Sequence, residues 1–161
     1  MSGELTAKRE AHRRIIWSCS WHPRRHRFAT GSRDKTVKVW EVGGDSSSPV
    51  ELARTLPPFG SSVTAVSWAE DGRLAVGMES GLIEVWSFLS APSSSSNGES
   101  VAVVRFDPFA CHVSSVRRLR WRRRRKNDEQ EEDGELWLAS CGDDNCVRIF
   151  KLSRRINLHH P

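Results

Sequence analysis

The sequence lacks the features that mark membrane and secreted proteins. No segment approaches the roughly 20 consecutive apolar residues that a membrane-spanning helix requires. The first fourteen residues, MSGELTAKREAHRR, contain no apolar core, so we expect no secretory signal peptide. These absences favour a protein of the cytoplasm and nucleus that has no membrane partner.

Cysteine is scarce, and its spacing suits no metal. Cys19, Cys111, Cys141 and Cys146 form no CxxC pair and no Cys/His pattern typical of zinc ligands. We interpret them as free thiols at strand positions rather than as a disulfide framework. The excess of basic residues is also small, because 25 Lys and Arg face 20 Asp and Glu and leave a net charge of +5. The composition therefore predicts neither a metal nor another cofactor.

Tyrosine is absent, whereas seven Trp and six Phe are present and follow an internal repeat. Three segments share one outline: an alternating strand that ends in Trp, a turn, a second strand, a tight polar turn, and a third strand that ends in an aromatic residue. The first strands end at Trp21, Trp68 and Trp121, and the third strands end at Trp40, Trp86 and Phe150. β-Branched and aromatic residues at every second position predict strands rather than helices.

Two serine-rich segments, 43–49 and 90–98, separate the repeats and are typical of surface loops. Each is followed by a strand-like run, Val50 to Leu56 and Val101 to Phe106, which we expect to form the outer strand of the preceding repeat. In the third repeat, a charged insertion over 122–135 lengthens the connection between the first two strands.

The chain resembles the WD40 family at specific positions. In that family a His begins the repeat, a Ser or Thr sits on the second strand, an Asp follows in the turn and a Trp ends the third strand, and the four side chains form one hydrogen-bonded network. The resemblance implies such a structural network in the first and third repeats, formed by His12, Thr30, Asp34 and Trp40 and by His112, Ser140 and Asp144. His12 precedes Trp21 by the same interval at which His112 precedes Trp121.

The remaining positions depart from this pattern. Phe150 replaces the Trp of the third repeat and has no indole donor. In the second repeat Phe59, Val76 and Ser80 stand at the His, Ser and Asp positions, so we expect a blade held by apolar packing alone. The same trio of residue types recurs at matched offsets in two repeats, which favours a structural device in each blade. We therefore predict no catalytic residues, no enzymatic activity and no small-molecule substrate.

The resemblance implies an all-β fold: three WD40 blades of four-stranded antiparallel sheet that form a partial, unclosed β-propeller. Three repeats are too few to close a ring that typically has four to eight blades. We therefore expect the first and last blades to expose apolar surface. The predicted boundaries are repeats at about 12–56, 57–106 and 112–152, the charged hairpin insertion at 122–135 and a short tail at 153–161.

A closer resemblance covers nearly the whole chain. The stretches 14–21, 28–35, 75–81 and 139–144 are similar, in the same order, to the C-terminal repeats of the WD40 scaffold subunits of Elongator. Members of that family are far longer. The resemblance implies a non-catalytic scaffold that binds the large scaffold subunit and the acetyltransferase-like catalytic subunit. It also implies an indirect link to tRNA, because Elongator modifies wobble uridine 34, and a connection with transcription elongation. An interaction module of another complex is the alternative.

One basic run has two interpretations. Eight of the ten residues from Arg117 to Lys126 are basic, so the run could contact nucleic acid or direct nuclear import. Six acidic residues over 128–135 follow at once and weaken the attraction for phosphate, which favours a solvated, self-neutralising loop. The candidate nucleic-acid contacts are Arg122, Arg123, Arg124, Arg125 and Lys126.

Overall fold

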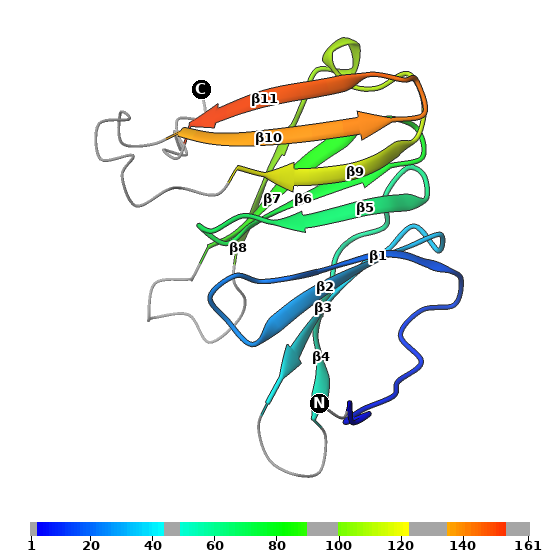
Figure 1. The fold of residues 1–161 in the computed structure, drawn as a ribbon, viewed down its shortest axis with the longest axis vertical. Coiled ribbons are helices and arrows are strands. Elements are labelled where there is room, and N and C mark those ends of the chain that lie inside the picture. The colour runs from blue at the N-terminus through cyan, green and yellow to red at the C-terminus, as the bar shows by residue number, and fades with distance from the viewer. Residues whose placement is uncertain (1–2, 44–48, 90–99, 123–134, 154–161) are drawn as a thin grey trace.

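The fold consists of three antiparallel sheets that pack face to face, one after another (Figure 1). The computed structural model describes residues 3–43, 49–89, 100–122 and 135–153. Its first sheet contains β1 (Ile16–Trp21), β2 (Arg27–Ser32), β3 (Val37–Val42) and β4 (Val50–Thr55). The second contains β5 (Val63–Trp68), β6 (Arg73–Met78), β7 (Ile83–Leu89) and β8 (Ser100–Arg105), and the third contains β9 (Val116–Trp121), β10 (Glu135–Gly142) and β11 (Val147–Ser153). A single turn of 3₁₀ helix, η1 (Pro108–Ala110), lies between β8 and β9.

The predicted all-β, unclosed fold is confirmed, with one difference in strand number. The first two sheets have four strands in chain order, whereas the third has three among the described residues. In the first two repeats the fourth strand follows the strand that carries the closing Trp, but the residues after β11, 154–161, lie outside the described part of the chain. Most of the predicted insertion, 123–134, also lies outside it. Among the described residues, no helix has the length and apolar character needed to cross a bilayer.

The inner strands bring the three sheets together. β5 lies beside β1 on one side and beside β9 on the other (Figure 1). Two apolar clusters fill the spaces between the sheets. The cluster between the first and second sheets includes Val37, Val39, Val63, Val66, Trp68 and Trp86, and the cluster between the second and third includes Ile83, Val85, Val116, Leu119, Leu138 and Phe150. The first and third sheets therefore each bury one face against a neighbour, and the second sheet buries both of its faces.

Glycine permits this close approach at two equivalent positions. Gly31 of β2 and Gly77 of β6 each face the inner strand of the next sheet. A Cβ on Gly31 would lie 2.6 Å from Cγ1 of Val63, and one on Gly77 would lie 2.6 Å from Cγ1 of Val116. Any side chain larger than hydrogen would push the sheets apart at these points.

Side chains also bond the sheets across the backbone of β5. Its N–H groups at Val66 and Trp68 donate to the hydroxyl oxygens of Ser18 and Ser20 on β1, at 3.2 and 3.1 Å. Its carbonyl at Ser67 accepts from the indole N–H of Trp121 at 2.9 Å. Side chains of both neighbouring sheets thus bond to the backbone of β5, and the β1 serines pair two N–H groups on its edge without a strand neighbour.

Candidate functional site

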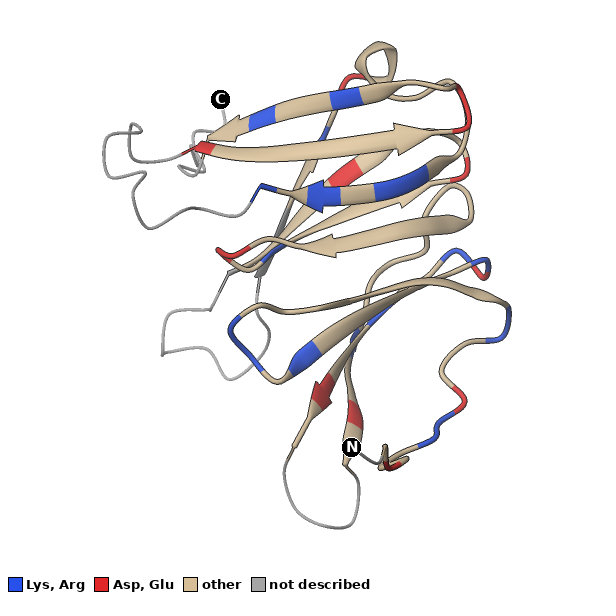
Figure 2. Ribbon diagram, in the orientation of Figure 1, with Lys and Arg blue, Asp and Glu red and all other residues tan. Residues whose placement is uncertain are grey.

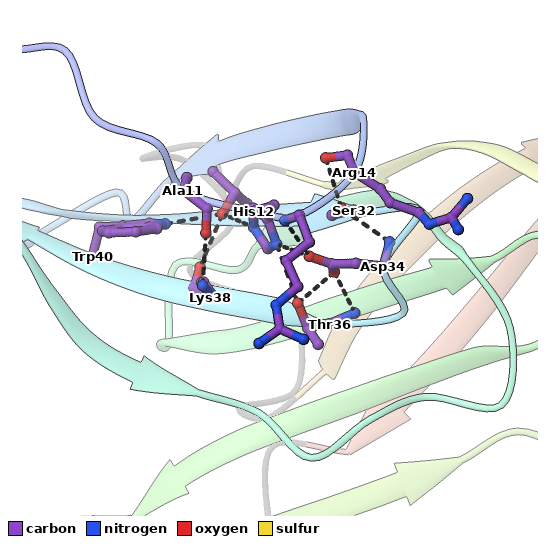
Figure 3. Close-up of polar contacts among 10 residues, drawn as sticks. Ala11, His12, Arg14, Ser32, Asp34, Thr36, Lys38 and Trp40 are labelled. Atoms are coloured by element: carbon purple, nitrogen blue, oxygen red, sulfur yellow. Dashed lines mark hydrogen bonds and ion pairs between the residues drawn. The ribbon is translucent and has the colours of Figure 1, made fainter.

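The first sheet contains a relay of four side chains drawn from one loop, two strands and one turn (Figure 3). The indole N–H of Trp40 donates to Thr30 Oγ1 at 2.9 Å, and Thr30 Oγ1 lies 2.7 Å from His12 Nε2. His12 Nδ1 lies 2.9 Å from Asp34 Oδ2. Because the Asp34 carboxylate can only accept, Nδ1 carries the ring proton and Nε2 accepts from the Thr30 hydroxyl. Every member of the relay is therefore paired.

Asp34 organises the turn that follows β2. Its Oδ1 accepts from the backbone N–H of Thr36 at 3.0 Å and from the Thr36 hydroxyl at 2.6 Å, while Oδ2 also accepts from the backbone N–H of Arg13 at 3.2 Å. Burial alone would raise the pKa of Asp34, but hydrogen bonds from Thr36, His12 and Arg13 outweigh it and lower the pKa to about 2. Burial lowers the pKa of His12, against the opposing effect of Asp34, so the ring is neutral near pH 7.

The third sheet contains a second relay of the same design. His112 Nε2 lies 2.7 Å from Ser140 Oγ, and His112 Nδ1 lies 2.8 Å from Asp144 Oδ1. Asp144 Oδ2 accepts from the Arg148 guanidinium at 2.8 Å. Burial again opposes ionisation, but the bonds from His112 and Arg148 hold the pKa of Asp144 well below its usual range. Phe150 supplies no donor to Ser140 and instead packs against Phe106, with ring centroids 4.3 Å apart.

The second sheet replaces the relay by aromatic packing, but not by apolar contacts alone. Phe59 packs edge-on against Trp86 at a centroid distance of 5.6 Å. The Trp86 indole N–H donates to the Glu84 carboxylate at 3.0 Å, because the Ser/Thr position holds Val76. Ser80 shares a hydrogen bond of 3.0 Å with Ser61. The expectation of a blade without polar contacts at these positions was wrong, since a buried indole N–H needs an acceptor.

The serine, histidine and aspartate of the third sheet have the order of contacts seen in a hydrolase triad, yet their surroundings differ. Ser140 and His112 are 2% and 3% exposed, so the hydroxyl has no open approach for a substrate. The first relay is buried in the same way, with Thr30 5% exposed. Within the described residues, no group of three or more His, Cys, Asp or Glu is placed to hold a metal ion. This geometry favours a structural role for both relays.

The basic run divides into two parts. Arg117 to Arg122 lie on or just after β9, where blue segments mark them in Figure 2. Arg122 is exposed, whereas Arg123, Arg124, Arg125 and Lys126 lie outside the described residues. Arg117 forms a forked pair with Asp143, with Nε–Oδ1 and Nη2–Oδ2 distances of 2.6 Å. That pairing raises the pKa of Arg117 and lowers the pKa of Asp143.

Sequence reasoning missed a cation beside each relay. Lys38 and Arg148 each stand two positions before the closing aromatic residue. Lys38 Nζ donates to the carbonyl of Ala11 at 2.6 Å, next to His12, while Arg148 donates to Asp144. Their matched offset from Trp40 and Phe150 was a signal that the alignment of repeats could have found.

Comparisons with known proteins agree with this architecture. The family model described as "WD domain, G-beta repeat" matches residues 3–41, 51–87 and 100–151. Among solved structures, the WD40 beta propeller domain of Doa1 is similar with a TM-score of 0.55 and 16% identity, covering 91% of this chain and 40% of that chain. This likeness concerns the fold.

Three curated relatives carry the same name, Elongator complex protein 2. The protein of Arabidopsis thaliana is 50% identical over 157 residues, which cover 93% of this chain and 18% of the relative. Those of Rattus norvegicus and Homo sapiens are 38% and 31% identical, and each match covers 89% of this chain and 19% of the relative. The chain thus spans about a fifth of the length of these relatives. Its three matched repeats and its stacked sheets show that it belongs to the WD40 repeat family.

Proposed function

We propose that this chain contributes a non-catalytic interaction scaffold to an Elongator assembly. The observation that carries the proposal is the 50% identity to Elongator complex protein 2 of Arabidopsis thaliana over nearly the whole chain. The two buried relays support it, because their His, Asp, Ser and Thr side chains are occupied inside the blades. The chain then acts in the cytoplasm and nucleus and supports wobble-uridine modification of tRNA and transcription elongation through its partners.

The loop before β9 offers the partner contact. Phe109 on η1 is 98% exposed, and Val113 in the same loop is 86% exposed. The loop is nevertheless held in place, since the Asp107 carboxylate accepts from the backbone N–H of Phe109 at 2.9 Å. A fixed, exposed aromatic ring with an aliphatic neighbour has the character of an interface anchor. We assign this anchor to the large scaffold subunit of Elongator.

Reconstitution tests the proposal. The purified chain is mixed with the large scaffold subunit and the acetyltransferase-like subunit, and complex formation is followed by size-exclusion chromatography with light scattering. We expect a complex of defined stoichiometry, which Phe109→Ala weakens by at least tenfold in Kd. Phe109→Ala should leave the melting temperature unchanged because the ring contacts solvent.

Phe106→Ala serves as the contrasting variant. Its ring packs against Phe150 at the edge of a buried cluster, so the substitution should lower the melting temperature. A monodisperse chain that binds neither subunit would refute the scaffold role. Binding that Phe109→Ala leaves intact would refute only the assignment of the anchor.

A further inference from the structure

The outer edge of the second sheet is formed by β8, at the opposite side of the sheet from β5 (Figure 1). Both faces of this sheet are covered, because one apolar cluster lies between it and the first sheet and the other lies between it and the third. The main contacts between strands of different sheets involve β5 or β9 rather than β8. Among the described residues, β8 therefore has β7 as its single strand neighbour with both adjoining sheets in place.

The register of β8 decides which of its backbone groups point outward. The N–H of Phe106, directly after β8, donates to the carbonyl of Ile83 on β7 at 3.4 Å. In an antiparallel ladder, residues that bond to the neighbouring strand alternate with residues whose backbone groups point away from it. Val104 therefore bonds to β7, whereas the N–H and C=O groups of Val103 and Arg105 point to the free edge.

The equivalent edge of the first sheet, β4, is protected in three ways. The register with β3 skips Ala53, which marks a β-bulge. The strand carries two charged residues, Glu51 and Arg54, and the Val50 carbonyl accepts from the Arg9 guanidinium at 2.7 Å. Bulges, charges and covering groups are the devices that keep edge strands from pairing with other chains.

β8 lacks these devices. Its register with β7 is continuous, and four consecutive apolar residues, Val101 to Val104, precede the single charge at Arg105. That charge is engaged on one face of the sheet, where Arg105 Nε donates to Glu84 Oε1 at 2.9 Å. The Val104 side chain is 41% exposed. A regular, apolar edge of this kind is one to which an extended peptide adds as a further strand.

The residues after β8 indicate which occupant suits this edge. Phe109, whose fixed and exposed ring we assign to the partner contact, stands four residues after the end of β8. The strand edge thus continues into the proposed anchor, and one extended segment of the partner can use both. A second copy of this chain is a less suitable occupant, because each copy carries a net charge of +5 and the two would repel.

We propose that β8 accepts an extended segment of the partner protein as a fifth strand of the second sheet. Backbone bonds to Val103 and Arg105 hold such a segment whatever its sequence. Side chains placed beside Val104 gain apolar contact, which selects a segment rich in β-branched residues. This mode of binding rests on the scaffold role proposed above and adds the form in which the partner binds.

Two substitutions at Val103 test whether the outward N–H takes part in binding. Val103→Pro removes that N–H and places a ring at the edge, while every bond to β7 remains. Val103→Ala keeps the N–H and also loses side-chain packing, because Val103 lies against the cluster between the first and second sheets. Isothermal titration calorimetry measures the affinity of each full-length variant for the purified large scaffold subunit. We expect Val103→Pro to bind roughly tenfold more weakly, the upper end of the range for one hydrogen bond, and Val103→Ala to bind like the unmodified chain.

Hydrogen exchange of the unmodified chain gives a second readout that requires no substitution. In the free chain, the outward amides of Val103 and Arg105 should exchange faster than the amide of Val104, which its bond to β7 protects. When the large scaffold subunit is added, exchange at Val103 and Arg105 should slow to the range of Val104.

Equal affinities of the two Val103 variants, or unchanged exchange at Val103 and Arg105 in the complex, would overturn strand addition and leave the scaffold role intact. An unmodified chain that binds neither Elongator subunit would refute the scaffold role, and this mode of binding would fail with it. A dimer of the chain alone, seen by light scattering and dissociated by Val103→Pro, would identify a second copy as the occupant and overturn the assignment to a partner.

Discussion

Removal of the Asp34 carboxylate should unfold the first sheet more readily than any other single side-chain change in its turn. Asp34 accepts from His12, the backbone of Arg13, and both the backbone and hydroxyl of Thr36. The Arg13 N–H is exposed and can turn to water, but the His12 side chain is 0% exposed. Asp34→Ala therefore leaves the buried ring N–H of His12 with the Thr36 hydroxyl, 3.1 Å away, as its remaining neutral acceptor, and it removes two charge-assisted bonds from the turn.

The expected cost is about 2–5 kcal/mol. Each bond to a charged group contributes about 1.5–3 kcal/mol, and part of this loss is recovered when the released groups of His12 and Thr36 bond to each other or to water. Asp34→Asn keeps one acceptor oxygen at the same place and should cost about half as much. The ranking of these two variants is the sharper test, because it depends on the acceptors and not on the volume of the side chain.

Urea unfolding followed by tryptophan fluorescence and by far-ultraviolet circular dichroism measures both costs. Hydrogen exchange at the Thr36 amide reports the turn directly. A free energy of unfolding for Asp34→Ala within about 0.5 kcal/mol of the unmodified chain would contradict the reasoning, since that range is expected for surface changes without structural partners. An Asn variant as unstable as the Ala variant would show that charge, rather than pairing, governs this site.

Three further outcomes follow from the same structure. The lowered pKa of Asp34 makes its carboxylate stabilising above pH 3.8, and this contribution should disappear as the pH falls toward 2; acid unfolding of Asp34→Asn should lack that loss. Thr30→Val should cost about 1–3 kcal/mol more than Ser140→Ala in urea unfolding, because it strands the Trp40 indole as well as His12, whereas Ser140 has no indole donor; equal costs would argue against the relay. Gly77→Ala should lower the melting temperature, because the added Cβ would lie 2.6 Å from Cγ1 of Val116. An unchanged melting curve would mean that the second and third sheets can move apart at this point without loss of stability.

The repeats were visible in the sequence because their signals are local. Alternation within a strand and the position of each closing aromatic require only neighbouring residues, so the sequence placed these strands in the first two sheets. The strands predicted to end at Trp40 and Trp86 continue to Val42 and Leu89. The His, Ser or Thr, and Asp positions stand at fixed offsets from those aromatics, and the structure brings them within hydrogen-bond distance in the first and third sheets.

Contacts between sheets could not be predicted in this way. The bonds from Ser18 and Ser20 to the backbone of β5 join residues 48 positions apart, and no spacing rule links them. Cys141 occupies in the third sheet the position that Gly31 and Gly77 occupy in the first two, but this equivalence is seen only once the register of β9 and β10 is known. The Glu84 acceptor of Trp86 was missed for a related reason. Val76 stands at the Ser/Thr position and cannot accept a hydrogen bond, so Glu84, its cross-strand partner on β7, accepts from the Trp86 indole instead.

The pairing of the β5 backbone by neighbouring side chains has a consequence for solubility. Serines of β1 occupy two N–H groups on the edge of β5 that has no strand neighbour. An edge whose donors are already bonded is a poor template for the strand of another molecule. Within the described residues, β4, β8 and β11 stand at the opposite edges of the three sheets, with one strand neighbour each. Intermolecular β-pairing and amyloid-like growth would therefore start at these edges rather than at the edge of β5.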